Sequence, residues 1–110
     1  MTLPNCKNAI VPIEKITNYL LDITHPHGKS KASFFNGTGY SFYDAEQLQT
    51  DLKLLACGSK ILETIPNERG VKYVIVGNLI APNGKIYLLK TVWIIEINQL
   101  KPRLVTAHLN

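Results

Sequence analysis

The chain has 110 residues, of which 45% are hydrophobic and 18% charged, a composition that excludes long disorder and suits one domain with its own core. Twelve Lys and Arg against eight Asp and Glu give a net charge of +4, which favours an anionic partner but is too small for a dedicated nucleic-acid coat protein. The N-terminal sequence MTLPNCKNAIVP lacks the features of a signal peptide, and no apolar run approaches the roughly 20 residues that span a bilayer. We expect one cytoplasmic domain over residues 1–110, with no membrane association.

Cys6 and Cys57 are the two cysteines of the chain, and they stand far apart. Neither belongs to a CxxC pair or has a histidine at the spacing of a zinc site, so we predict no metal and no other cofactor. Because cytoplasmic proteins keep their thiols reduced, we expect two free thiols. A disulfide between the two residues is the alternative.

The N-terminal third begins with an irregular arm or short edge strand over residues 1–11. Pro12 suits a first helical position, and apolar residues recur at spacings of three and four from Ile13 onward. This pattern predicts an amphipathic helix over residues 12–22. The helix ends before Pro26, since the residue that precedes a proline avoids helical dihedral angles.

The segment HPHGKSKASFFNGTGYSFY, residues 25–43, concentrates polar chemistry that folding alone does not require. We interpret it as a loop that runs into a short helix, with Lys29 and Lys31 near the start of that helix. Its inward-facing residues are expected to be Ala32, Phe34 and Phe35. Ser41 and Asp44 then supply capping groups for a further helix over residues 44–56, which Gly58 ends.

The C-terminal half is rich in β-branched and aromatic residues. Residues 60–65 are either another helical turn or the approach to a strand, and residues 66–70 are a connector. Three strands follow over residues 71–81, 85–97 and 103–109. An Asn-Gly pair between the first two is a strong hairpin signal. The order predicts an α+β fold with N-terminal helices packed on a C-terminal antiparallel β-meander of at least three strands.

The register of this meander follows from its turns. If Asn83 and Gly84 alone form the first turn, Val76 lies opposite Thr91 and Val74 opposite Trp93. If residues 98–101 form the second, the predicted pairs are Ile95 with Leu104, Trp93 with Thr106, Thr91 with His108, and Glu96 with Arg103 as an ion pair. Thr91, Trp93, Thr106 and His108 would then share one face and form a small pocket at its end.

The stretches HPHGKSKASFF, KYVIVGNLIAPNGKIYLLKTVWII and PRLVTAHL resemble a family of small uncharacterised bacterial domains with an HPxGxxKAxFF segment, a TVWI strand and a PRLVTA-like last strand. The resemblance covers about nine tenths of the chain and implies a compact domain. The element order, size and basic charge are distantly similar to the barnase, EndoU, colicin and RelE-like ribonuclease toxins. That resemblance implies RNA cleavage without a metal, although the chain carries no diagnostic toxin motif.

Metal-free RNA cleavage needs a base for the 2′-hydroxyl proton, an acid for the leaving oxygen, and cations near the phosphate. Histidines suit the proton transfers because imidazole titrates near neutral pH, and lysines suit the charge. Each candidate residue also has a structural interpretation, as an exposed turn, a solvated helix start, a strand tail or a core residue. The predicted catalytic residues are His25, His27, Lys29, Lys31 and His108, and the predicted binding residues are Thr91, Trp93 and Thr106.

Three functions are consistent with these patterns. The first is a toxin-type nuclease, in which His25 or His27 pairs with His108 and the lysines bind phosphate. The second is a protein-interaction module without catalysis, either a toxin–antitoxin or immunity partner or a homodimer scaffold, because both sheet faces are rich in apolar residues. The third is a ligand sensor that uses Thr91, Trp93 and His108. The expected partners are RNA, a cognate protein and a second copy of the chain.

Overall fold

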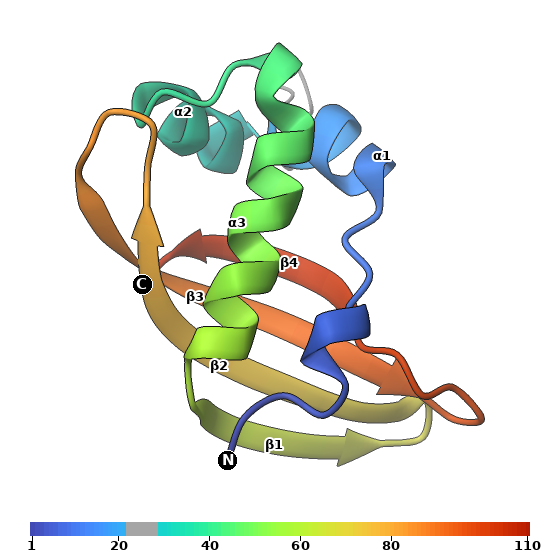
Figure 1. Ribbon diagram of the computed structural model, residues 1–110. Helices are drawn as coiled ribbons and strands as arrows, with labels where there is room; N and C mark the ends of the chain where they lie inside the picture. Colours follow the sequence, from blue (N-terminus) through green and yellow to red (C-terminus); the bar gives the residue numbers. More distant parts are fainter. Residues whose placement is uncertain (22–28) are drawn as a thin grey trace.

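The computed structural model describes residues 1–21 and 29–110 and forms an α+β fold, with helices packed on one antiparallel sheet (Figure 1). The strands follow the order β1-β2-β3-β4, so each pairs with its neighbours in the chain. The predicted fold class is therefore confirmed, with a fourth strand added. The elements are a 3-10 turn at Cys6–Asn8, α1 (Ile13–Lys15), a π-helical turn at Ile16–Leu20, α2 (Lys29–Gly37), a 3-10 turn at Phe42–Asp44, α3 (Ala45–Gly58), β1 (Ile61–Asn67), β2 (Gly70–Ile80), β3 (Ile86–Glu96) and β4 (Arg103–Leu109).

The helical predictions are confirmed over the described residues. The apolar stripe after Pro12 forms α1 and the π-helical turn, and it buries Ile16 and Leu20 completely. In α2, Ala32 and Phe35 are fully buried, and the partly buried Phe34 packs against the core. The third helix begins where expected, after a capping box in which the Ser41 N–H and hydroxyl both donate to Asp44 Oδ2. These hydrogen bonds lower the pKa of the Asp44 carboxyl. Among the described residues, no helix is both long and apolar enough to cross a bilayer.

The prediction of a connector over residues 66–70 is wrong, because β1 continues to Asn67 and pairs with β2 as far as Gly70. The connection is a tight turn, stabilised by Asn67 Oδ1, which accepts hydrogen bonds from the N–H groups of Arg69 and Gly70. Gly70 has φ +148°, and a Cβ there would lie 2.2 Å from the Ile95 carbonyl oxygen. A glycine is therefore required at the start of β2, where its backbone lies close to that of β3.

The predicted register between β2 and β3 is shifted by one residue. The turn holds three residues, Pro82, Asn83 and Gly84, because the Ala81 N–H donates to the Lys85 carbonyl across it. Gly84 has φ +82°, as expected for a three-residue turn that ends in a left-handed residue. Thr91 consequently lies opposite Ile75 in place of Val76, and Trp93 opposite Tyr73 in place of Val74.

The predicted register between β3 and β4 is wrong for two reasons. Beside the connecting loop, Leu104 pairs with Trp93 in place of Ile95, a shift of two residues, and a β-bulge follows at Val92. On one side of the bulge Trp93 pairs with Leu104, and on the other Val92 pairs with Thr106. Thr91 lies opposite Ala107 and Lys90 opposite His108. Because one extra residue in β4 reverses the side-chain alternation, Thr106 and His108 face away from Thr91 and Trp93. The predicted pocket that joined these four residues does not form.

One face of the sheet, here called the covered face, packs against the helices. Figure 1 shows α3 lying across the strands, and Gly77 gives it room, since a Cβ there would lie 2.1 Å from the Ser59 Oγ. Trp93 and Thr91 lie at the centre of this face and are fully buried. The indole Nε1 donates to the Thr91 hydroxyl at 2.9 Å, and that hydroxyl donates to the Ile75 carbonyl at 2.8 Å.

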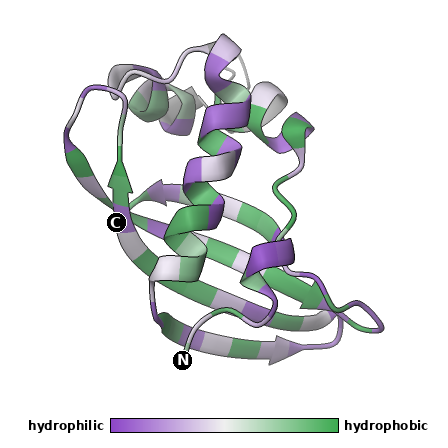
Figure 2. Cartoon of the chain, in the orientation of Figure 1, coloured by the Kyte–Doolittle hydropathy of each residue, from purple (hydrophilic) through white to green (hydrophobic). Residues whose placement is uncertain are grey.

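The N-terminal arm runs beside β4 and ties the start of the chain to its end. The Ile10 N–H donates to the Pro102 carbonyl, and the Leu104 N–H donates to the Ile10 carbonyl. Leu3, Ala9 and Val11 of the arm are buried in the same core as α3 and the sheet. The prediction of an irregular arm is confirmed, and β4 is an edge strand of the sheet. Hydrophobic and hydrophilic segments alternate along the strands (Figure 2).

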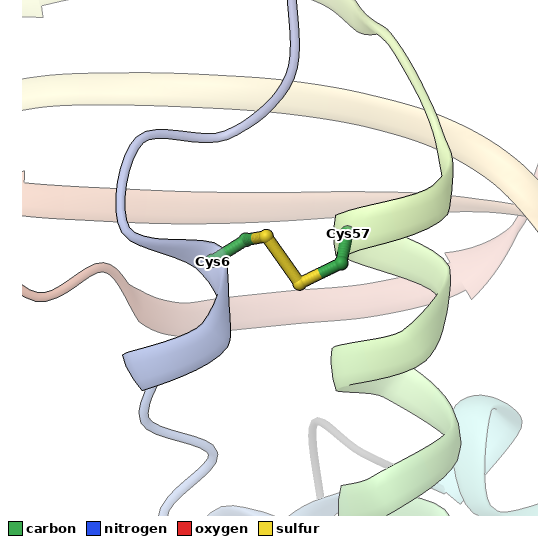
Figure 3. The surroundings of a disulfide bond; sticks show 2 residues. All are labelled: Cys6 and Cys57. Carbon is green, nitrogen blue, oxygen red and sulfur yellow. A yellow bond between two sulfur atoms is a disulfide. The ribbon is translucent and has the colours of Figure 1, made fainter.

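The expectation of two free thiols is wrong, because Cys6 and Cys57 form a disulfide (Figure 3). It joins the N-terminal arm to the end of α3, with the two Cα atoms 5.4 Å apart and a sequence separation of 51 residues. Sequence spacing carries no signal for this bond, since the arm reaches α3 only in the folded chain. A cross-link over a loop of this length stabilises mainly by restricting the unfolded chain.

Reduction of this disulfide is expected to lower the free energy of unfolding by about 2–4 kcal/mol. Urea unfolding followed by circular dichroism, with and without dithiothreitol, measures the change. The Cys6→Ser/Cys57→Ser double variant should match the reduced protein and should not respond to dithiothreitol. Equal urea midpoints for the oxidised and reduced protein would contradict this role.

Tyr40 provides a second stability test, because its buried phenol donates to Asp51 Oδ2 at 2.6 Å. Burial and this hydrogen bond raise the pKa of Tyr40 above its ordinary value of about 10. Above that pH the unfolded tyrosine ionises while the folded one stays neutral, so this contribution to stability is present below about pH 10 and is lost as the pH rises further. Tyr40→Phe should cost about 1–2 kcal/mol at pH 7 and should reduce the alkaline loss. The control is Tyr43→Phe, because the Tyr43 side chain is 93% exposed; an equal effect of both variants would refute the assignment.

Candidate functional site

The sheet has a second face, here called the open face, on the side away from α3 (Figure 1). Three rows of side chains cross it, and the strand register defines them. Val74 and Ile94 lie at its centre and are nearly buried, at 4% and 6% exposure, while basic and polar side chains surround them. The rows are Val76, Lys90 and His108; then Val74, Val92 and Thr106; then Lys72, Ile94 and Arg103.

His108 lies at one end of the open face, on the edge strand β4. Directly opposite it on β3 is Lys90, so an imidazole and an ammonium group share one cross-strand position. The Nδ1 atom of His108 lies 3.1 Å from the Leu109 carbonyl oxygen. The residue is partly exposed, so a bound molecule can reach it.

Thr106 lies on the same face as His108, two residues before it on β4. Its hydroxyl oxygen is buried and has no hydrogen-bond partner among the described residues. A buried polar atom without a partner costs free energy relative to a satisfied one. Thr106 and His108 thus share one face as predicted, but Thr91 and Trp93 lie on the other.

A basic pocket of about 430 Å³ lies at the other end of the open face. Arg69 from the β1–β2 turn, Lys72 from β2 and Arg103 from β4 line it, together with Pro12 and Lys15 of the N-terminal segment. Arg103 forms the predicted ion pair with Glu96, although its partner in the strand register is Ile94. The pair is therefore diagonal, and the other cationic side chains that line the pocket are Lys15, Arg69 and Lys72.

The distance between the two ends of the open face suits an extended polymer. Lys90 and Ile94 lie four residues apart on β3, which corresponds to about 13 Å along a strand. The row of Lys90 and His108 and the row of Lys72 and Arg103 are separated by that length. A chain of phosphates can therefore contact cations in both rows while apolar groups lie against Val92 and Ile94.

The remaining predicted site residues lie elsewhere or outside the description. His25 and His27 fall outside the described residues. Lys29 begins α2, and Lys31 lies in the same helix with a partly buried side chain. That helix packs on the covered face, where the Phe34 and Tyr87 rings meet edge to face at 5.4 Å between centroids. The roles predicted for these four residues stay predictions.

Thr91 and Trp93 lie in the core and hydrogen-bond to each other. Both side chains are fully buried, so their visible contribution is to the packing and register of the sheet. Their predicted role in ligand binding stays a prediction. His108, the third residue of the predicted ligand sensor, lies on the opposite face of the sheet.

The basic residues of the open face are not among the predicted catalytic or binding residues. Lys72, Lys90 and Arg103 occupy positions that face the same side on three adjacent strands, a signal that only a correct register reveals. Arg69 lies in a tight turn, within the range predicted as a connector. The missing information is therefore the length of two turns and the position of one bulge.

The fold is similar to that of a chain in a solved complex, a contact-dependent growth inhibition toxin–immunity protein complex from Klebsiella pneumoniae 342. The TM-score is 0.72 at 14% sequence identity, and the alignment covers 93% of this chain and 100% of that chain. At this identity the likeness concerns the fold alone. No curated protein sequence matches the chain.

One sequence family matches almost the whole chain. It is described as a domain of unknown function, DUF6883, and its match extends over residues 2–110. It therefore includes the N-terminal arm, all the helices and all four strands described above. The chain belongs to the DUF6883 family.

Proposed function

We propose that the chain is a toxin-type ribonuclease that cleaves RNA without a metal and binds it along the open face. The observation that carries the proposal is the placement of His108 and Lys90 at one end of a face whose other end is a basic pocket. The net charge of +4 agrees with a polyanionic substrate. The fold similarity to a chain from a toxin–immunity protein complex supports a role in such a system.

RNA can bind this face through its phosphates and its bases. Lys72 and Arg69 suit one phosphate in the basic pocket, and Lys90 suits another beside His108. The apolar centre of the face, at Val74, Val92 and Ile94, offers contacts to unstacked bases. Single-stranded RNA fits better than duplex RNA, because its bases are free to lie on a protein surface.

Cleavage in this proposal proceeds by internal transfer. The RNA 2′-oxygen loses its proton to a base and bonds to phosphorus, and the 5′-oxygen leaves with a proton from an acid, which produces a 2′,3′-cyclic phosphate. His108 performs one of these two proton transfers, and His25 or His27 performs the other. Lys90 stabilises the charge that develops on the phosphate oxygens.

A protein-interaction module without catalysis is the second candidate. The solved complex contains both a toxin and an immunity protein, and either kind of chain suits a domain that binds a cognate protein. The feature that favours this candidate is a group of exposed apolar side chains on the β2–β3 hairpin, where Ile80, Ile86 and Leu88 are 69%, 64% and 46% exposed. RNA cleavage by the purified chain separates the two candidates.

The first test of the nuclease is the rate of RNA cleavage by His108 variants. His108→Ala and His108→Gln should both lower the rate by roughly 10²–10⁴-fold, because neither side chain transfers a proton. Cleavage of labelled transfer RNA and ribosomal RNA in EDTA, resolved on denaturing gels, gives the rates and reveals cyclic-phosphate ends.

The matched control for this test is Leu109→Ala, which changes the neighbouring strand-end residue and should leave the rate unchanged. Thermal unfolding of each variant shows whether the fold is retained. An intact wild-type chain that cleaves neither RNA would overturn the nuclease proposal in favour of the interaction module. Full activity of a folded His108→Ala variant would overturn the assignment of His108.

The second test is the salt dependence of RNA binding. The Arg69→Ala/Lys72→Ala double variant should bind single-stranded RNA more weakly, and its slope of log affinity against log salt should become shallower by about 0.7 for each phosphate that the variant no longer neutralises. Fluorescence anisotropy of a labelled oligonucleotide, with a His108→Ala background to prevent cleavage, measures both quantities. Lys7→Ala, in the 3-10 turn that packs against α3, is the control. Equal slopes for both variants would place the RNA elsewhere on the chain.

A further inference from the structure

The sheet has an incomplete edge beside α3. Strand β2 extends from Gly70 to Ile80, but β1 pairs with it only as far as Ile75. Residues 76–80 of β2 therefore have a strand neighbour on one side, β3, and, within the described residues, none on the other. An edge of this kind presents unpaired backbone groups that another strand can bind.

The hydrogen-bond alternation identifies which residues present these groups. The Ala81 N–H donates to the Lys85 carbonyl across the hairpin, so odd-numbered residues of β2 bond to β3 and even-numbered residues point to the opposite edge. Val76, Asn78 and Ile80 therefore direct their N–H and C=O groups outward. Within residues 1–21 and 29–110, no backbone hydrogen bond partner meets these groups.

A groove of about 460 Å³ follows this edge, between β2 and the C-terminal part of α3. Leu54 forms one wall, and its side chain is 66% exposed. Ile80 and Leu88, on the open face of the hairpin, lie along the other side and are also exposed. The edge thus combines free backbone groups with apolar side chains above and below them, the arrangement that favours strand addition.

Positive charges at the two ends of the edge indicate what kind of strand can bind there. Lys60 lines the groove where β1 begins, and Lys85 follows the β2–β3 turn at the other end; both are exposed. Neither has an ion-pair partner in the part of the chain that the structure describes. Asp51, which also lines the groove, already accepts hydrogen bonds from Tyr40 and Gln47.

A second copy of the chain is a poor match for this edge. An antiparallel pairing of two copies centred on Asn78 would place the Lys60 end of one copy against the Lys85 end of the other. Like charges in contact are unfavourable, and each copy also carries a net charge of +4. The electrostatics therefore favour an acidic partner.

We propose that the β2 edge at residues 76–80 binds an extended strand of a partner protein, with apolar side chains at alternate positions and acidic side chains at its ends. The strand completes the sheet beside β2, and its carboxylates pair with Lys60 and Lys85. This surface goes beyond the proposed nuclease and does not depend on it, because His108 lies on the opposite edge strand, β4.

The test uses a fluorescent seven-residue peptide of alternating valine and threonine with glutamate at both ends, titrated into the intact oxidised chain. We expect saturable binding that Asn78→Pro weakens at least tenfold, because proline lacks the outward N–H while no bond to β3 is lost. Asn78→Thr keeps the N–H and should bind within about twofold of wild type. Lys60→Glu/Lys85→Glu should also weaken binding, whereas Lys101→Glu, in the β3–β4 loop, should not.

Three outcomes would overturn the proposal. They are absence of saturable binding, equal affinities of the folded Asn78→Pro and Asn78→Thr variants, and a concentration-dependent dimer that Asn78→Pro abolishes. The last would assign the edge to a second copy. RNA cleavage by the Asn78→Pro variant is measured in parallel. Cleavage depends on the open face and peptide binding on the β2 edge, so loss of one activity with retention of the other shows which of the two proposals has failed.

Discussion

The β-bulge between Val92 and Trp93 is the constraint on which the candidate site depends. On its N-terminal side in β4, Leu104 faces the core beside Trp93; on its C-terminal side, Thr106 and His108 face the opposite way. A regular β4 would direct the imidazole toward the helices, in a region that the core already fills. Bulges often redirect side chains at functional sites. Here one extra residue lets Leu104 pack in the core while Thr106 and His108 lie on the open face.

The covered face supplies the rigidity that such a site needs. The Trp93 indole and the Thr91 hydroxyl satisfy each other's hydrogen bonds beneath α3, and the hydroxyl also binds the Ile75 carbonyl on the next strand. Their polar atoms therefore fix the register of β2 against β3 at no cost of unsatisfied groups. Since Lys72, Lys90 and His108 project from the same strands on the other side, their spacing follows from this packing.

Sequence patterns predicted the element types well, because apolar periodicity and capping residues act locally. The stripe after Pro12, the inward Phe35 and the Ser41 and Asp44 cap all appear in the structure. The turn lengths and the bulge were beyond reach, since both depend on how strands twist against the helices. The error of one residue at Pro82 placed Thr91 opposite the wrong neighbour, and the bulge reversed the face of His108. The disulfide was missed because only tertiary packing brings Cys6 to Cys57.

The bridge between Ile10 and β4 bears on when the domain becomes complete during synthesis. The sheet is a series of local hairpins, which form readily as each strand emerges. The arm at Ile10, however, finds its hydrogen-bond partners only at Pro102 and Leu104, and β4 also supplies the core with Ala107. A ribosome-bound chain that stops before β4 therefore has neither a closed core nor His108. Completion of the fold and assembly of the candidate site thus both require the synthesis of β4.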